Sequence, residues 1–279
     1  MFYLNGQLID EEIALSIRDR GFLLGDGLFE TILCVKGVCI ALANHWHRLC
    51  SGAKYLNIPI RFSLTDISQA IVQLLQKNDL MSVQSAIRIT LTRGVGPRGL
   101  STAHLKQPTL LITCEKYKAP TQTAIRLSFT PNFANKYCPL HQFKTLNYLD
   151  KITAKQEAAK KGYDDALLLN SKHCIVGTSC ANIFFMYHGI LLTPAISSGC
   201  LPGITRDYVL ALAKQMKLKR LQKQLPYEQT SNYDAAFVTN SLIGIMPVSQ
   251  IDQINFDIEH SLIKTLKQRY DERLENLSS

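Results

Sequence analysis

The chain has 279 residues, which is more than one average domain and less than two large ones, so two modest domains are expected. Hydrophobic residues make up 46% of the sequence and charged residues 19%, which excludes a disordered chain or a fibrous repeat and predicts a globular protein. The formal net charge of +9 suggests an anionic partner: nucleic acid, a membrane surface or a small anionic ligand. Because the basic residues form no dense stripe with interleaved aromatic residues, nucleic-acid binding is not the expected primary function.

The eight cysteines and the N-terminal segment bear on the cellular compartment. The cysteines include no Cys-x-x-Cys pair and no paired Cys/His spacing, so we expect reduced thiols, no metal site and no disulfide framework. Residues 1–6 lack the basic and apolar regions of a secretory signal, and no stretch is long and apolar enough to cross a membrane. The sequence therefore predicts a cytoplasmic protein without a membrane partner.

Residues 1–115 are predicted to form a small α+β domain. Asn5-Gly6 and Lys36-Gly37 are typical of two-residue hairpin turns. Asn44 is expected to cap the first helix, and Ser63 with Asp66 approximates a capping box for the second. The expected elements are strands 2–9, 28–34 and 38–42, helices 44–56 and 63–76, and strands 83–92 and 109–114.

Residues 116–123 are expected to be an interdomain linker, because Lys, Pro, Thr and Gln replace apolar periodicity there. Residues 124–279 are predicted to form a larger α/β domain. Its expected elements are strand 125–129, helix 146–161, strands 166–169 and 182–186, a helix that opens at 203–205, strand 235–239 and helix 258–274.

Three segments far apart in the sequence have the composition of an anion receptor. In Leu201–Arg206 a glycine lets the backbone approach a ligand where a helix begins and offers free N–H groups. Arg48 could donate a bidentate pair to a phosphate, and Thr239–Ser241 offers two hydroxyls and an amide. Taken alone, each segment has a plainer interpretation: a turn before a helix, a solvated arginine and a strand end.

Lys144 differs from the many other lysines in its surroundings. It lies in the segment 141–149, where Phe and Leu neighbours could hold the amine half-buried and lower its pKa toward nucleophilic use. Most lysines are solvated, so this signal needs a connection to a phosphate site.

That connection is a resemblance to the class IV, or fold type IV, pyridoxal-phosphate enzymes. The family comprises D-amino-acid aminotransferases, branched-chain aminotransferases and 4-amino-4-deoxychorismate lyase. The resemblance implies an α+β, two-domain, D-amino-acid aminotransferase-like fold, pyridoxal 5'-phosphate as cofactor, a small-molecule substrate and a homodimer. The segments that carry it, in the order and approximate spacing of the family, are 19–31, 45–49, 144–148, 182–184, 203–206 and 239–242.

Carried over residue by residue, the resemblance makes Lys144 the catalytic Schiff-base lysine and proton shuttle. No metal is implied. The interface between the two domains is expected to hold the cofactor, with Arg48 on one side and Lys144 on the other. The implied cofactor contacts, besides Lys144, are Arg48, Gly203, Ile204, Thr205 and one of Asn240 or Ser241.

One position departs from the family pattern. The family usually has a Glu at the place of Gly177, five residues before Asn182, and its carboxylate keeps the pyridine nitrogen protonated. Without this carboxylate the pyridine ring of the cofactor is a poorer electron sink. This should lower the turnover of an aminotransferase more than that of a lyase whose product becomes aromatic. Asp164 and Asp165 lie at what resembles a separate family position and are not counted as substitutes.

Two further positions favour the lyase within the family. D-amino-acid aminotransferases have Arg and His two residues apart in the loop at 93–101; here Arg98 is present, but Leu100 occupies the His position. Phe29 stands where the aminotransferases commonly have Tyr. Arg98 and Arg93 are candidate contacts for a substrate carboxylate, with a surface-loop role as the alternative.

The expected reaction is the conversion of 4-amino-4-deoxychorismate to 4-aminobenzoate and pyruvate, a step toward folate. Two alternatives stay open. One is a class IV aminotransferase acting on D- or branched-chain amino acids, and the other is a cofactor-binding homologue whose catalysis is impaired by Gly177.

Overall fold

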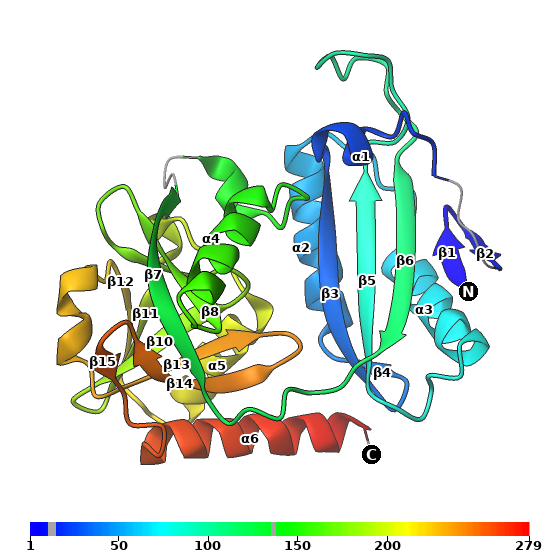
Figure 1. Ribbon diagram of the computed structural model, residues 1–279. Coiled ribbons are helices and arrows are strands. Elements are labelled where there is room, and N and C mark those ends of the chain that lie inside the picture. The colour runs from blue at the N-terminus through cyan, green and yellow to red at the C-terminus, as the bar shows by residue number, and fades with distance from the viewer. Residues whose placement is uncertain (11–14, 135–137, 279) are drawn as a thin grey trace. The chain divides into compact units, whose positions relative to one another are not determined.

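The chain folds into two compact units, which are seen in a computed structural model that describes residues 1–10, 15–134 and 138–278 (Figure 1). Unit 1 contains residues up to Lys118, the segment Phe143–Asn147 and the end of the chain from Asn276. Unit 2 contains Ala119–Gln142 and Tyr148–Glu275. The segment 143–147, which the expected boundary at residue 124 assigns to the second domain, is thus part of unit 1.

Unit 1 is built on a six-stranded antiparallel sheet with the strand order β2-β1-β6-β5-β3-β4. The residues of both predicted hairpin turns, Asn5-Gly6 and Lys36-Gly37, have positive φ, as two-residue turns require. The strands are β1 (Phe2–Leu4), β2 (Gln7–Ile9), β3 (Gly27–Val35), β4 (Val38–Cys39), β5 (Ser85–Thr92) and β6 (Thr109–Lys116).

Three helices belong to unit 1: α1 (Arg20–Leu24), α2 (Leu42–Tyr55) and α3 (Leu64–Lys77). The predicted capping box of α3 is confirmed, since Ser63 and Asp66 exchange both of its hydrogen bonds. The predicted start of α2 at Asn44 is wrong: Ala41, in a left-handed conformation, precedes the helix, and no side chain caps it. The connection from β4 is so short that the chain turns into α2 almost at once.

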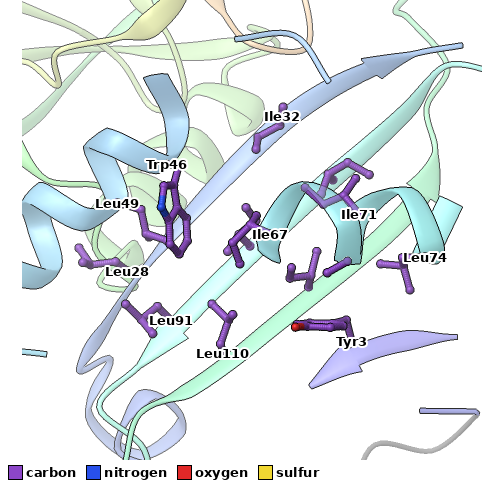
Figure 2. Close-up of a cluster of buried hydrophobic side chains, with 14 of the residues drawn as sticks. Tyr3, Leu28, Ile32, Trp46, Leu49, Ile67, Ile71, Leu74, Leu91 and Leu110 are labelled. Atoms are coloured by element: carbon purple, nitrogen blue, oxygen red, sulfur yellow. The ribbon is translucent and has the colours of Figure 1, made fainter. Parts of the chain in front are cut away.

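Helices α2 and α3 supply the apolar core of unit 1 against one face of the sheet (Figure 2). Because side chains alternate along a strand, Leu28, Glu30 and Ile32 of β3 point to the same face. Leu28 and Ile32 are core residues, whereas Glu30 places a carboxylate among them. The other labelled core residues are Tyr3, Trp46, Leu49, Ile67, Ile71, Leu74, Leu91 and Leu110.

Unit 2 contains a mixed nine-stranded sheet with the path β12-β11-β10-β13-β14-β7-β8-β9, and β15 pairs with β14. Strand β7 is parallel to both of its neighbours, β8 and β14. The strands are β7 (Ile125–Ala134), β8 (Asp165–Asn170), β9 (Ile175–Thr178), β10 (Asn182–Tyr187), β11 (Ile190–Pro194), β12 (Arg220–Lys223), β13 (Ala235–Asn240), β14 (Gly244–Ile251) and β15 (Ile254–Asn255).

The long helices of unit 2 are α4 (Leu149–Lys160), α5 (Ile204–Gln215) and α6 (Ser261–Ser278), and short 3-10 turns lie at Pro139–Gln142, Ile196–Ser198 and Tyr227–Asn232. Helix α4 begins three residues later than the predicted start at 146. The reason is that the residues before it bond to β3: Thr145 bridges to Leu28, and Leu146 donates its N–H to the carbonyl of Gly27 at 3.0 Å. Those residues pair with β3 and so cannot join the helix.

The eight cysteines are free thiols in this structure. The structure adds one relation that spacing does not reveal: Cys34 and Cys39 lie opposite each other across β3 and β4, with their sulfur atoms 3.3 Å apart. Among the described residues no cluster of His, Cys, Asp or Glu has the arrangement of a metal site. Within the same residues, no helix has the length and hydropathy needed to span a membrane.

Candidate active site

Lys144 is fixed against strand β3 within unit 1. The N–H of Phe29 donates to the Lys144 carbonyl at 2.9 Å, and Leu28 and Thr145 form an isolated β-bridge. The Lys144 Nζ lies 4.2 Å from the centroid of the Phe29 ring, and the guanidinium carbon of Arg88 lies 3.9 Å from the same centroid. The backbone pairing and the ring together restrict where the amine can be.

Arg48 meets a buried carboxylate in the same unit. Its Nε donates to Glu30 Oε1 at 2.8 Å and its Nη2 donates to Glu30 Oε2 at 2.7 Å, which is a bidentate pair. The Nδ1 of His45 lies 2.7 Å from Glu30 Oε2. Both His45 and Arg48 come from α2, three residues apart and thus on one side of the helix.

The pKa values in this cluster depart from their ordinary range in directions that the contacts explain. Burial raises the pKa of Glu30, but the hydrogen bonds and charges of Arg48 and His45 outweigh it, so that the pKa lies below its usual range. Burial lowers the pKa of His45 more than Glu30 raises it. Around neutral pH Glu30 is therefore ionised and His45 is neutral, with its proton on the Nδ1 that faces Glu30.

The start of α5 forms the second part of the candidate site, in unit 2. Gly203 is the N-cap residue of the helix and, as a glycine, has no side chain with which to cap its first N–H groups. A Cβ at position 203 would overlap the Oδ1 of Asn182, whose amide nitrogen donates to the carbonyl of Leu201 at 2.9 Å. Asn182 therefore holds the turn, and glycine is the residue that fits beside it.

The structure refines the parts that Thr205 and Asn240 can play. Thr205 lies in the first turn of α5, so its N–H is among the donors that the helix start offers. The Oδ1 of Asn240 accepts the N–H groups of the turn that follows, and its amide nitrogen points at the carbonyl of Cys180. Asn240 thus shapes the loop after β13.

Gly177 on strand β9 has a φ of +154°, a conformation that residues with a side chain rarely adopt. A Cβ there would also lie 2.8 Å from the carbonyl oxygen of Ala181. In the neighbouring strand, the buried Asp165 accepts hydrogen bonds from Ser179 at 2.5 Å and from Cys180 at 3.5 Å. Asp165 is thus tied to the turn that follows β9.

Similarity to known proteins identifies the family. The chain matches the model of the class IV aminotransferases over residues 27–251. The chain belongs to the class IV aminotransferase family. It is 34% identical to a putative branched-chain-amino-acid aminotransferase of Methanocaldococcus jannaschii, over 96% of this chain and 94% of that protein.

Two solved structures extend the comparison. The crystal structure of a putative 4-amino-4-deoxychorismate lyase from Legionella pneumophila is 34% identical, with a TM-score of 0.88 and 96% of each chain covered. The branched-chain aminotransferase of Escherichia coli has the same fold, with a TM-score of 0.92 at 24% identity and coverage of 97% of this chain and 93% of that one. The fold type IV architecture predicted from the sequence is confirmed.

Class IV enzymes use pyridoxal 5'-phosphate, and the residues of this chain fit it. The glycine at the start of α5 and the crowding beside it suit a phosphate against the backbone, and Lys144 would provide an amine for the aldehyde. When bound, the cofactor supplies an electrophilic carbonyl and an electron sink. This class IV enzyme does not divide its site residues as expected, because Arg48 and Lys144 both belong to unit 1.

Arg93 and Arg98, the predicted substrate contacts, differ sharply in their surroundings. Arg93 is buried, and its three guanidinium nitrogens donate to the Asp26 carboxylate and to the carbonyls of Asn57 and Leu56. This arrangement makes Arg93 a structural residue at the base of its loop, so it is not retained as a substrate contact. Arg98 is exposed on the loop between β5 and β6.

Sequence reasoning missed Glu30 and His45, although both lie in segments that carry the family resemblance. A signal for Glu30 was available, since it stands between Leu28 and Ile32 on the apolar face of a predicted strand. For Asn182 the segment was noted, but no signal in the sequence indicated its contact with Leu201.

Protonation of His45 should weaken the folded state. The pKa of His45 is lower in the folded than in the unfolded chain. As the pH decreases below about 6.5, the ordinary pKa of histidine, the unfolded chain therefore binds more protons than the folded chain, and the free energy of unfolding decreases. Glu30 adds a further loss, at lower pH, as it is protonated through its lowered folded pKa. Urea unfolding of the holoenzyme, followed by the fluorescence of the single tryptophan, Trp46, would measure both.

A His45→Gln variant is the control, because it keeps a donor for Glu30 and removes the titration. We expect its free energy of unfolding to change less between pH 7.5 and pH 5.5 than that of the parent enzyme. Equal slopes for the two proteins would contradict the assignment to His45.

Gly177→Ala is expected to cost about 1–3 kcal/mol of stability, because of its backbone conformation and the close Ala181 carbonyl. Gly177→Glu shares this cost and adds a carboxylate, so the difference between the two variants isolates the effect of the charge. We expect Gly177→Glu to raise aminotransferase turnover relative to Gly177→Ala. If both variants give the same lyase and aminotransferase turnover, the interpretation of this position is wrong.

Proposed function

We propose that this class IV enzyme is a 4-amino-4-deoxychorismate lyase, which forms 4-aminobenzoate and pyruvate and serves folate synthesis. The observation that carries the proposal is Gly177, where the family resemblance leads one to expect a carboxylate and the backbone favours glycine. A reaction whose product ring becomes aromatic depends less on a strong electron sink than transamination does. Similarity to the putative lyase of Legionella pneumophila supports the same activity.

In the proposed reaction the Lys144 amine removes the proton at C4 of the substrate, and the electron pair left at C4 completes the aromatic ring as the ring C–O bond to the enolpyruvyl group breaks. Lys144 then returns a proton to the released enolpyruvate, which becomes pyruvate. Lys144 therefore serves as both amine nucleophile and base. The proposed phosphate contacts are Arg48, the backbone of Gly203, Ile204 and Thr205, and one of Asn240 or Ser241. Arg98, exposed on its loop, is the proposed contact for a substrate carboxylate.

An aminotransferase of branched-chain amino acids is the second candidate, because the Methanocaldococcus jannaschii relative, with that name, is as similar at 34% identity. Product analysis separates the two. The purified holoenzyme is supplied with 4-amino-4-deoxychorismate generated in situ, and in parallel with 2-oxoglutarate and either leucine or D-alanine. We expect 4-aminobenzoate from the first reaction and little glutamate from the others. Glutamate without 4-aminobenzoate would replace the lyase proposal, and no turnover in any assay would favour a catalytically impaired homologue.

We also propose a homodimer, supported by an exposed apolar surface on unit 1. Arg20 joins the two segments of this surface, around α1 and in the loop after β5. Its guanidinium donates to the carbonyl of Gly99 at 2.8 Å, and its backbone N–H donates to the carbonyl of Gly94. Exposed apolar side chains on neighbouring segments are typical of an interface. Those on these segments are Ile17, Phe22, Leu23, Leu24, Val95 and Leu100.

Light scattering after size exclusion should give twice the 31.3 kDa of one chain. Phe22→Asp is expected to yield monomers, whereas Leu221→Asp, at an exposed position of unit 2, should not. A monomeric parent protein would refute the dimer.

A cytoplasmic location is proposed as well, on the free state of all eight cysteines.

A further inference from the structure

Glu30 is a carboxylate in a place where carboxylates are costly. Its exposed fraction is 0%, and its strand neighbours on the same face, Leu28 and Ile32, belong to the apolar core of unit 1. Burying an ion in such surroundings costs several kcal/mol unless hydrogen bonds and an opposite charge compensate it. A Leu or Gln there would avoid that cost, so the charge at this position requires an explanation beyond packing.

The contacts of Glu30 converge on one residue, Arg48. Nε and Nη2 occupy one edge of the planar guanidinium, and both donate to the carboxylate. Two parallel hydrogen bonds fix the plane as well as the position of the group. Because the guanidinium is planar, its opposite edge, which carries Nη1, then faces away from Glu30.

His45 completes the coordination of the carboxylate without adding a charge. Its Nδ1 lies 2.7 Å from Oε2, the oxygen that also accepts from Arg48 Nη2. His45 itself is buried, with an exposed fraction of 1%, and is neutral near pH 7 by the direction of its pKa. Glu30 is thus held from α2 by two side chains, of which Arg48 carries the positive charge that balances the carboxylate.

We propose that Glu30 is a positioning residue for phosphate recognition: with His45 it locks the Arg48 guanidinium in the orientation in which its outer edge binds the cofactor phosphate. The inference rests on the proposed role of Arg48 as a phosphate contact and is independent of whether the enzyme is a lyase or an aminotransferase. An arginine that is already ordered loses less side-chain entropy when the anion binds, so Glu30 raises affinity without touching the ligand.

The test compares two ligands that differ only in the phosphate. Pyridoxal 5'-phosphate and pyridoxal carry the same aldehyde for Lys144, but pyridoxal lacks the phosphate that Arg48 would bind. Their dissociation constants can be followed through the fluorescence of Trp46, which lies between His45 and Arg48 on α2. For Glu30→Gln we expect binding of pyridoxal 5'-phosphate to weaken about 10–100-fold, the range for loss of hydrogen bonds to a charged group. Binding of pyridoxal should change less than about threefold.

Three variants complete the design. Glu115→Gln makes the same chemical change at an exposed position of β6 in unit 1 and should leave both affinities unchanged. In an Arg48→Lys background, Glu30→Gln should have little further effect on pyridoxal 5'-phosphate, because Glu30 acts through the guanidinium. Glu30→Asp keeps the charge on a shorter side chain and should give an intermediate loss; it serves as the test if Glu30→Gln does not fold.

The outcomes are distinct. Equal weakening of pyridoxal and pyridoxal 5'-phosphate in the Glu30 variants would show a general structural role and overturn the proposal. Additive effects of the Glu30 and Arg48 substitutions would do the same. If Arg48→Lys alone leaves binding of pyridoxal 5'-phosphate unchanged, Arg48 does not bind the phosphate and the proposal fails at its premise. None of these measurements uses an amino-acid or chorismate substrate, so failure of the lyase assay would leave them unaffected.

Discussion

Replacing Lys144 with alanine is expected to lower turnover by about 10²–10⁴-fold, the range for loss of a positioned acid–base group. The reason is that one amine is assigned both to bind the cofactor aldehyde and to move the C4 proton. The side chain starts from a segment paired with β3 and ends 4.2 Å from the centroid of the Phe29 ring, so no neighbouring lysine can take the same position without moving the backbone. The rate of 4-aminobenzoate formation measures the loss of turnover.

Borohydride reduction followed by peptide mass spectrometry identifies the lysine that binds the cofactor aldehyde, since reduction fixes the cofactor to that lysine. Lys151 is the matched control: it is half-buried, its Nζ lies 4.3 Å from the centroid of the Tyr148 ring, and burial lowers its pKa. We expect the reduced cofactor on the peptide with Lys144 in the parent enzyme and in Lys151→Ala. Label on Lys151, or label that survives Lys144→Ala, would overturn the assignment.

Local signals in the sequence predicted local structure well. The Asn5-Gly6 and Lys36-Gly37 turns and the Ser63 capping box depend on residues only a few positions apart, and all three are present. The start of α2 was missed because Ala41, rather than a side-chain cap at Asn44, precedes the helix. The sequence does not indicate that Ala41 is left-handed, because this conformation follows from the short connection to β4.

Long-range pairing explains why Lys144 was expected in the wrong unit. Its segment is separated from β3 by more than a hundred residues, yet it pairs with that strand through Phe29 and Leu28. No periodicity in residues 143–147 indicates that partner. The family resemblance identified the lysine, but only the fold shows that it shares a unit with Arg48 and Glu30.

The same distinction applies to charge. The net charge of +9 suggests an anionic partner, but it does not indicate which arginines would bind it. The arginines differ in their hydrogen-bond partners. Arg48 donates to the carboxylate of Glu30 through Nε and Nη2, while Arg93 donates through all three guanidinium nitrogens to Asp26, Asn57 and Leu56. Composition counts both residues equally, whereas the hydrogen bonds show which groups each arginine holds.

Gly203→Ala is expected to weaken binding of pyridoxal 5'-phosphate about 10–100-fold, because it disturbs the backbone N–H groups proposed to receive the phosphate. The added Cβ would overlap Oδ1 of Asn182, so either that side chain or the start of α5 must move. Equilibrium dialysis of the variant against the cofactor measures the loss.

Asn182→Ala in the same chain tests the cause, since it removes the atom that the new Cβ meets and with it the hydrogen bond to Leu201. If the clash sets the loss, the double variant should bind the cofactor more tightly than Gly203→Ala alone, despite having lost one more interaction. If the double variant binds more weakly than either single variant, the effect at position 203 comes from the backbone itself. In that case the fit between glycine and Asn182 would not be what shapes the phosphate-binding turn.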